Sequence, residues 1–167
     1  MHNQLTQSDI QKMKEEIEHR KLVIRKQAIE EVKEARAQGD LSENFEYYAA
    51  KKYKNQNESR IRYLERMIKT AEVLEDTSAA DEVGMNNTVE VYFEEDDEIE
   101  TYRIVTTVRE NSLKGLISVE SPIGKAVYGR KVGDRVKVKV NDSYEYYVEI
   151  RSITKTEDDS QDKIRSF

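Results

Sequence analysis

The stretch Ala35-Arg36-Ala37-Gln38-Gly39-Asp40-Leu41-Ser42-Glu43-Asn44 lies between two long segments with helical patterning. Glycine readily adopts the left-handed conformation that ends helices, so Gly39 predicts the end of the first helix. A second helix is expected to begin just after Asp40. Because the connection is so short, the two helices must run antiparallel. The stretch therefore predicts a sharp turn at the end of a helical hairpin, with Asp40 and Glu43 in the turn.

The segment before the turn carries a narrow apolar stripe. Residues 6–9 offer side chains suited to capping a helix. Apolar residues then follow at steps of three, four and seven: Ile10, Met13, Ile17, Ile24, Ala28, Val32 and Ala35. Such a stripe suits a seam between two helices. We expect an uninterrupted helix from about Ser8 to Ala37, about 45 Å long.

The segment after the turn predicts a second helix that extends to about Leu74. Its apolar residues lie at the two ends, and residues 51–60 between them are strongly polar. The apolar residues are Phe45, Tyr48 and Ala49 near the turn and Ile61, Leu64, Ile68 and Ala71 at the far end. Helix propensity alone is a weak term, so most of the stability must come from packing between the helices.

Composition limits the class of protein. Hydrophobic residues and charged residues each make up 37% of the 167 residues, which suits a fold with much solvated surface. The absence of cysteine excludes a disulfide framework and a thiolate metal site. No apolar run approaches the roughly 18 residues of a membrane-spanning helix, and residues 1–10 show no signal peptide. We therefore expect an intracellular protein that does not enter a membrane.

Charge and glycine content change near residue 76. Residues 1–76 hold 15 basic and 15 acidic residues and one glycine, whereas the remainder carries the whole net charge of −6, the only proline and the other five glycines. This net charge argues against a general nucleic-acid coat. The change predicts a hairpin over 1–76, a linker over 77–87, a second domain over 88–154 and a polar, frayed tail over 155–167.

The second domain is expected to be a small antiparallel sheet with one short helix. Alternating patterns predict strands over 88–93, 99–105, 116–119, 135–140 and 143–153. Ser121 followed by Pro122 is typical of a helix start, and Gly129 of its end. The predicted fold class is therefore α+β, with a helical hairpin followed by an antiparallel β domain.

Two blocks of sequence resemble a known family. The first consists of Ala35-Arg36, Gly39-Asp40-Leu41-Ser42-Glu43-Asn44, Glu46-Tyr47 and Ala49-Ala50-Lys51. The second consists of Gly115-Leu116-Ile117-Ser118-Val119, Ser121-Pro122-Ile123-Gly124-Lys125-Ala126 and Gly129-Arg130-Lys131-Val132-Gly133-Asp134. Together they resemble the bacterial GreA/GreB transcript cleavage factors, and more closely the GreA branch. The resemblance extends from about Thr6 to Ile153.

The resemblance implies a coiled-coil hairpin followed by an FKBP-like domain. It further implies that this domain docks on RNA polymerase, and that the hairpin enters the secondary channel and stimulates the polymerase's own cleavage of backtracked RNA. On this reading the partners are RNA polymerase and the 3′ end of the nascent transcript. The protein is expected to be a cytoplasmic monomer, associated with the nucleoid through the polymerase, and an activator rather than an enzyme. The alternative is a regulator of the same fold that occupies the channel without promoting cleavage.

Asp40 and Glu43 match the two acidic tip positions of the resembled family. Phosphodiester hydrolysis uses divalent cations that stabilise the attacking and leaving oxygens, and Mg²⁺ accepts carboxylate ligands. The resemblance assigns both residues to catalysis, as ligands of Mg²⁺ completed by the polymerase. The residues themselves also allow a second interpretation, in which Asp40 caps the second helix and Glu43 completes a capping box.

Two further groups of residues have expected roles and simpler alternatives. In the resembled family, basic residues at about the positions of Arg36, Lys51 and Lys52 contact RNA near its 3′ end; otherwise they belong to a solvated helix face. Ser121-Pro122-Ile123-Gly124 matches the polymerase-docking loop of the family, although Ser-Pro is also simply a good helix start.

Overall fold

The computed structural model describes residues 3–39, 44–156 and 158–166. The chain forms two compact units: a hairpin unit, Ile10–Ala71, and a globular unit made of residues 1–9 and 72–167. The expected boundary placed residues 1–76 in the hairpin. In the structure, residues 1–9 and 72–76 belong to the globular unit instead, because strand β1 (Gln4–Leu5) pairs in parallel with strand β2 (Glu72–Val73).

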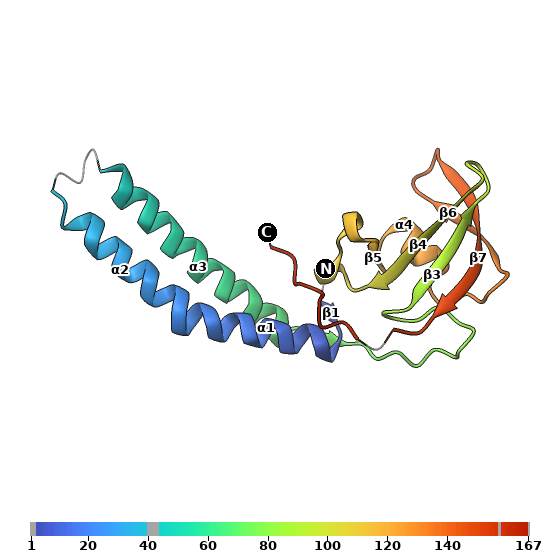
Figure 1. Ribbon diagram of the computed structural model, residues 1–167, viewed down its shortest axis with the longest axis horizontal. Helices are drawn as coiled ribbons and strands as arrows, with labels where there is room; N and C mark the ends of the chain where they lie inside the picture. Colours follow the sequence, from blue (N-terminus) through green and yellow to red (C-terminus); the bar gives the residue numbers. More distant parts are fainter. Residues whose placement is uncertain (1–2, 40–43, 157, 167) are drawn as a thin grey trace. The chain divides into compact units, whose positions relative to one another are not determined.

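The hairpin is built from helices α1 (Gln7–His19), α2 (Arg25–Arg36) and α3 (Phe45–Lys69). Figure 1 shows α2 and α3 lying side by side and antiparallel, as the short connection predicted. The first helix was expected to be uninterrupted, but a π-helical turn, η1 (Arg20–Ile24), joins α1 to α2. In it the N–H of Arg25 donates to the carbonyl of Arg20, so the helix widens without breaking.

The turn η1 coincides with polar contacts to α3. Arg20 Nη1 donates to Asn57 Oδ1 at 2.9 Å, and Asn57 Nδ2 donates back to the Arg20 carbonyl at 3.3 Å. Arg25 forms a two-pronged ion pair with Glu58, at 2.7 and 2.8 Å. Single π-helical turns occur mostly inside α-helices, and here one occurs where side chains from the facing helix are hydrogen-bonded.

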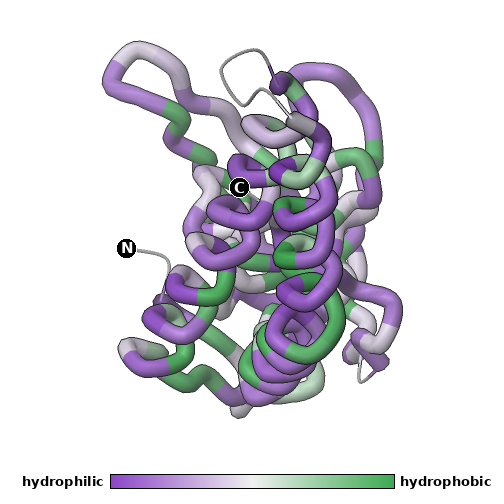
Figure 2. The backbone as a smooth tube through the Cα atoms, turned by 90° about the vertical axis from the view of Figure 1, so that its left-hand side faces the viewer, coloured by the Kyte–Doolittle hydropathy of each residue, from purple (hydrophilic) through white to green (hydrophobic). Residues whose placement is uncertain are grey.

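The seam of the hairpin is narrow and partly polar. The buried apolar residues within the hairpin unit are Met13, Ala28, Ala35, Ala50, Ile61, Leu64 and Met67. Figure 2 shows the consequence, with short hydrophobic patches interrupting mostly hydrophilic helical turns. The charged pair Arg60–Glu16 lies in this seam, with Arg60 Nε 2.9 Å from Glu16 Oε2. Three of the seven residues of the expected helical stripe are buried: Met13, Ala28 and Ala35.

The globular unit contains a five-stranded sheet in the order β5-β4-β3-β7-β6 (Figure 1). Its elements are β3 (Thr88–Phe93), β4 (Glu98–Val105), β5 (Leu116–Ser118), α4 (Pro122–Val127), β6 (Arg135–Lys139) and β7 (Glu145–Thr154). The predicted strands and helix are therefore all present. The sheet is mixed rather than purely antiparallel, because β5 pairs with β4 in parallel. Two 3-10 turns, η2 (Thr107–Arg109) and η3 (Ser112–Lys114), form the connection between these two parallel strands.

Branched apolar side chains form the core of the globular unit. Its buried members are Val83, Val89, Val91, Ile104, Val127, Val136, Val138, Val148 and Ile150. They come from four strands, from α4 and from the segment before β3. Alternating burial along β3 and β6 confirms the period-two pattern read from the sequence.

The segment 77–87 was predicted to be a linker, but its C-terminal part is packed into the globular unit. Val83, Gly84, Met85 and Asn87 are buried. Lys155 Nζ donates to the Glu82 carbonyl and to Asn87 Oδ1, both at 2.8 Å. The segment that was expected to connect two domains therefore supplies core residues and fixes the end of β7.

The polar tail was expected to fray, but its described residues 158–166 make contacts with the rest of the globular unit. The side chain of Asp162 is buried, and the N–H of Arg165 donates to the Val108 carbonyl at 2.7 Å. Within the described part of the chain, no helix is long and apolar enough to cross a membrane.

Candidate functional site at the hairpin tip

Helix α2 ends where the sequence predicted. The N–H groups of Ala37 and Gln38 donate to the carbonyls of Lys33 and Ala35, at 3.1 and 3.3 Å. Gly39 then takes φ +113°, a conformation that L side chains rarely adopt. An added Cβ at Gly39 would meet nothing within 4 Å, so backbone conformation alone requires glycine there.

Helix α3 begins later than predicted, and its cap is Asn44. Asn44 Oδ1 accepts a hydrogen bond from the Tyr47 N–H at 3.0 Å, which satisfies one of the free donors of the first turn. Asn44 Nδ2 donates to the Ala35 carbonyl at 2.6 Å, across the hairpin. The predicted start just after Asp40 was therefore wrong, because α3 begins at Phe45. Asp40 and Glu43, the predicted catalytic and Mg²⁺-binding residues, lie outside the described residues.

The basic residues predicted to contact RNA lie on the first helical turns beside the tip. Arg36, Lys51 and Lys52 are all exposed. The Arg36 guanidinium lies 5.6 Å from the centre of the Tyr47 ring, and its Nη2 donates to the Tyr47 hydroxyl at 3.5 Å. The hydrogen bond from Arg36, assisted by the charge of Lys51, lowers the pKa of Tyr47 from its ordinary value. Arg36 and Lys51 therefore both act on Tyr47, whereas Lys52 is not among the residues that affect it.

Phe45 is one of the apolar residues expected near the turn end of the second helix, and 85% of its surface is exposed. As the first residue of α3 it follows the Asn44 cap directly.

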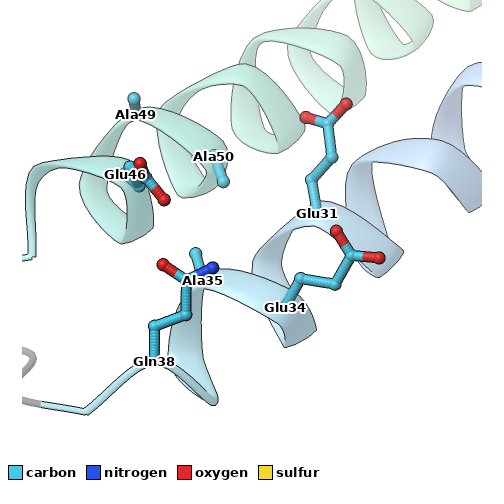
Figure 3. Close-up of a pocket in the computed structure, with 7 residues that line it drawn as sticks. All are labelled: Glu31, Glu34, Ala35, Gln38, Glu46, Ala49 and Ala50. Carbon is cyan, nitrogen blue, oxygen red and sulfur yellow. The ribbon is translucent and has the colours of Figure 1, made fainter.

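A hollow of about 370 Å³ lies between α2 and α3 beside the tip. Its lining comes from both helices: Glu31, Glu34, Ala35, Gln38, Glu46, Ala49 and Ala50 (Figure 3). Three of these residues carry carboxylates. Even so, in the described ranges no three His, Cys, Asp or Glu side chains are grouped so that they could hold a metal ion. The hollow is an acidic surface without a metal-binding geometry of its own.

The predicted docking loop forms the start of α4. Ser121 Oγ accepts from the Gly124 N–H at 3.1 Å and donates to the Ser118 carbonyl at 2.6 Å. Pro122 is exposed at the first helical position, Ile123 is half-buried and Gly124 is buried. A Cβ on Gly124 would lie 2.0 Å from the Ser118 carbonyl oxygen. Gly124 therefore has a packing role, and Pro122 is the member of this loop best placed to meet a partner.

The hairpin and the mixed β domain define a two-unit protein whose helical arm ends in a short polar connection. Two family descriptions match this chain. "Transcription elongation factor, N-terminal" matches residues 3–73, and "Transcription elongation factor, GreA/GreB, C-term" matches residues 77–155. The chain belongs to the GreA/GreB family of transcription elongation factors.

Individual relatives agree with the family. The chain is 42% identical over 150 residues to the transcription elongation factor GreA of Mesoplasma florum, covering 89% of this chain and 96% of that protein. It is 45% identical over 137 residues to GreA of Thermoanaerobacter pseudethanolicus, covering 81% and 87%.

Solved structures were also compared with this chain. The GreA factor homolog 1 of Thermus thermophilus is 24% identical, with a TM-score of 0.40, and the match covers 91% of this chain and 98% of that one. A GreA/GreB factor from Nitrosomonas europaea is 25% identical, also with a TM-score of 0.40, covering 57% and 79%.

Proposed function

We propose that this protein binds RNA polymerase, inserts its hairpin tip through the secondary channel and stimulates the polymerase's own cleavage of backtracked RNA. Asp40 and Glu43 are the residues assigned to this chemistry. The protein itself is an activator, and the bond is broken in the active centre of the polymerase.

The observation that carries the proposal is the position of the two carboxylates in the chain. Helix α2 ends at Arg36 and α3 begins at Phe45, and both acids lie in the connection between them. The hydrogen bond from Asn44 to the Ala35 carbonyl ties the two helix ends together. Because Asn44 already caps α3, the helix start does not need a carboxylate from the connection.

The proposed function includes Mg²⁺ as a cofactor whose ligands come from this protein and from the polymerase. Carboxylate oxygens are ligands that Mg²⁺ accepts, but two of them are too few for an all-protein site. Among the residues that the structure describes, no three His, Cys, Asp or Glu side chains form a metal site. We therefore infer that the remaining ligands come from the polymerase. The bound ion would stabilise charge on the phosphate oxygens during hydrolysis.

The exposed cations beside the tip fit a role in holding the transcript. Arg36 and Lys51 offer positive charge to RNA phosphates on two facing helices. Lys52 is a neighbouring, exposed charge with a smaller expected contribution. Docking of the globular unit is assigned to the start of α4, where exposed Pro122 follows the Ser121 cap.

A cleavage assay tests the proposal. A stalled, backtracked elongation complex with 3′-labelled RNA is mixed with the protein and Mg²⁺. Release of short 3′ fragments is expected from the wild type and is lost in Asp40→Asn and in Glu43→Gln, while binding to the polymerase persists. Glu46→Gln is the matched control, since Glu46 is an exposed acid in the first turn of α3 and should remain active.

Two other outcomes would change the assignment. If the wild type binds the polymerase but releases no fragment, the cleavage function is wrong and a channel-occupying regulator takes its place. If the purified protein hydrolyses free RNA alone, the division of labour between factor and polymerase is wrong.

A further inference from the structure

Arg109 is a charged residue that the sequence reading did not single out, and its side chain is completely buried. Its Nε lies 2.5 Å from Oδ1 of Asp9, which is also completely buried. The approach is a close charge contact rather than an aligned hydrogen bond. Its Nη2 donates to Asn86 Oδ1 at 2.6 Å. A buried arginine is stable only with such partners, because removing its charge from water is costly.

The C-terminal tail supplies further carboxylates to this arginine. Arg109 Nη1 donates to Asp162 Oδ2 at 2.8 Å, and Asp159 Oδ2 lies 3.6 Å from the same nitrogen. The other oxygen of Asp162 accepts from Arg103 Nη2. Asp162 is thus bound by two guanidinium groups, one at each oxygen. Two guanidiniums that converge on one carboxylate form a strong, geometrically specific anion site.

The tail reaches this site through additional contacts along η2. The N–H of Arg165 donates to the Val108 carbonyl at 2.7 Å, and Arg165 Nη1 lies 3.1 Å from Glu110 Oε2. These contacts flank the point where Asp162 enters. We call residues 158–166 the C-terminal strap.

The strap comes from outside the segment that matches the family. The match to the C-terminal family description ends at residue 155, and Arg103 and Arg109 lie inside the matched region, 77–155. Without the carboxylates of the strap, Arg109 would keep the carboxylate of Asp9, and Arg103 would lose its contact with Asp162. The site would then carry an excess positive charge in a poorly solvated place, which favours the capture of an anion.

We propose that Arg103 and Arg109 form an anion-binding site for a carboxylate or phosphate group, and that the strap closes this site by inserting Asp162 as a built-in ligand. The site accepts an external anion when Asp162 is withdrawn. The inference concerns only the globular unit and stands independently of the cleavage function.

Chemical rescue tests this proposal on the full-length chain. Asp162→Ala removes the built-in carboxylate and is expected to lower the melting temperature. Sodium acetate, compared with sodium chloride at equal ionic strength and fixed pH, should restore much of that loss, while the wild type gains nothing beyond the chloride control. A parallel titration with sodium phosphate separates the two classes of anion, because acetate alone should act if only a carboxylate fits.

Two variants make the result specific. Asp158→Ala alters an exposed acid of the same strap and should show no anion response. Arg103→Gln combined with Asp162→Ala should abolish the rescue, because one of the two guanidiniums is lost. If Asp162→Ala does not fold, Asp162→Asn keeps the shape of the side chain and is tested in the same titrations.

The anion titrations have one result that supports the proposal and one that overturns it. Recovery by acetate or phosphate that depends on Arg103 supports the anion site. Equal responses of the Asp162 variant and the wild type to every salt would overturn it and leave the strap as a structural element.

Discussion

The side-chain amide of Asn44 donates a hydrogen bond of 2.6 Å to the carbonyl of Ala35, so the first cap of α3 is tied to the last turn of α2. The same side chain accepts from the Tyr47 N–H. Asn44 thus performs two tasks with its two polar atoms. A carboxylate at this position would be able only to accept from the Tyr47 N–H, since it has no hydrogen to donate to the Ala35 carbonyl.

The two hydrogen-bonding roles of Asn44 predict different results for two substitutions at this position. Asn44→Ala removes the cap and the cross-link and should lower the free energy of unfolding by about 1–2 kcal/mol. Asn44→Asp keeps the acceptor for Tyr47 but loses the donor to Ala35, so it should cost less in stability while still loosening the tip. Chemical denaturation gives the stability, and hydrogen exchange of the amides beside the tip reports the loosening. Equal effects of both substitutions on exchange would show that the cross-link does not matter.

Arg36 is expected to affect cleavage through its charge. Arg36→Ala should raise the concentration of factor needed for half-maximal cleavage about tenfold, the equivalent of about 1.4 kcal/mol for one charged contact. It should also weaken the salt dependence, because one phosphate contact is lost. Measuring cleavage at several salt concentrations checks both effects.

Tyr47→Phe is the control for this prediction. It removes the hydroxyl that contacts Arg36 but keeps the ring beneath the guanidinium. We expect activity close to that of the wild type.

In Arg36→Ala the pKa of Tyr47 should rise toward its ordinary value of 10.0, since the hydrogen bond from Arg36 is the main cause that lowers it. Ring signals of labelled Tyr47, followed by NMR against pH, report this change.

Glu16 makes the stability of the hairpin depend on pH. Burial opposes its ionisation, but hydrogen bonds from Arg60 and Arg20 outweigh burial and lower the pKa of Glu16 below 4.5. A carboxylate whose pKa is lower in the folded state stabilises the fold fully above its unfolded pKa. This contribution is lost as the pH falls through the lower, folded-state pKa.

The substitution Glu16→Gln isolates that contribution. At pH 7 the variant should be less stable than the wild type by about 1–2 kcal/mol, as expected for partly exposed, charged hydrogen bonds. The difference should shrink toward zero as the pH falls below about 4.5, where the wild-type carboxyl takes up its proton. Glu18→Gln, at an exposed position of the same helix, should show no such difference. Helical circular dichroism followed against temperature at several pH values measures these differences.

The parts of the fold that sequence predicted well are those that depend on local periodicity. Alternation over Thr88–Phe93 fixed β3 to the residue, and Ser121 before Pro122 fixed the start of α4. In both cases the determining interactions lie within a few residues. The order of the sheet depends on distant pairings, and the parallel pairing of β5 with β4 was accordingly missed.

The tip shows why local reasoning has limits. Asp40 and Asn44 are both good cap residues, so propensity alone does not choose between them. The choice falls on Asn44, whose amide also reaches the Ala35 carbonyl nine residues away. Asp162 is a stronger case, since Arg103 and Arg109 lie more than 50 residues earlier in the chain. The assignment of Asp40 and Glu43 to catalysis stays a prediction from family resemblance.

The start of α4 allows folding and docking to be separated. Gly124→Ala places a methyl group 2.0 Å from the Ser118 carbonyl oxygen, a backbone atom that cannot move aside easily. It should destabilise the globular unit by about 2 kcal/mol or more, as overpacking does. Pro122→Ala changes an exposed side chain, so its effect on stability should stay within about 0.5 kcal/mol.

Binding to RNA polymerase then distinguishes the two roles of this loop. Pro122→Ala should weaken binding severalfold if the loop docks on the polymerase, because its stability is almost unchanged. A loss of binding in Gly124→Ala alone would instead mean that the globular unit had lost its structure. Measuring polymerase affinity and thermal stability for both variants therefore decides whether the loop is a docking surface or only a well-formed helix start.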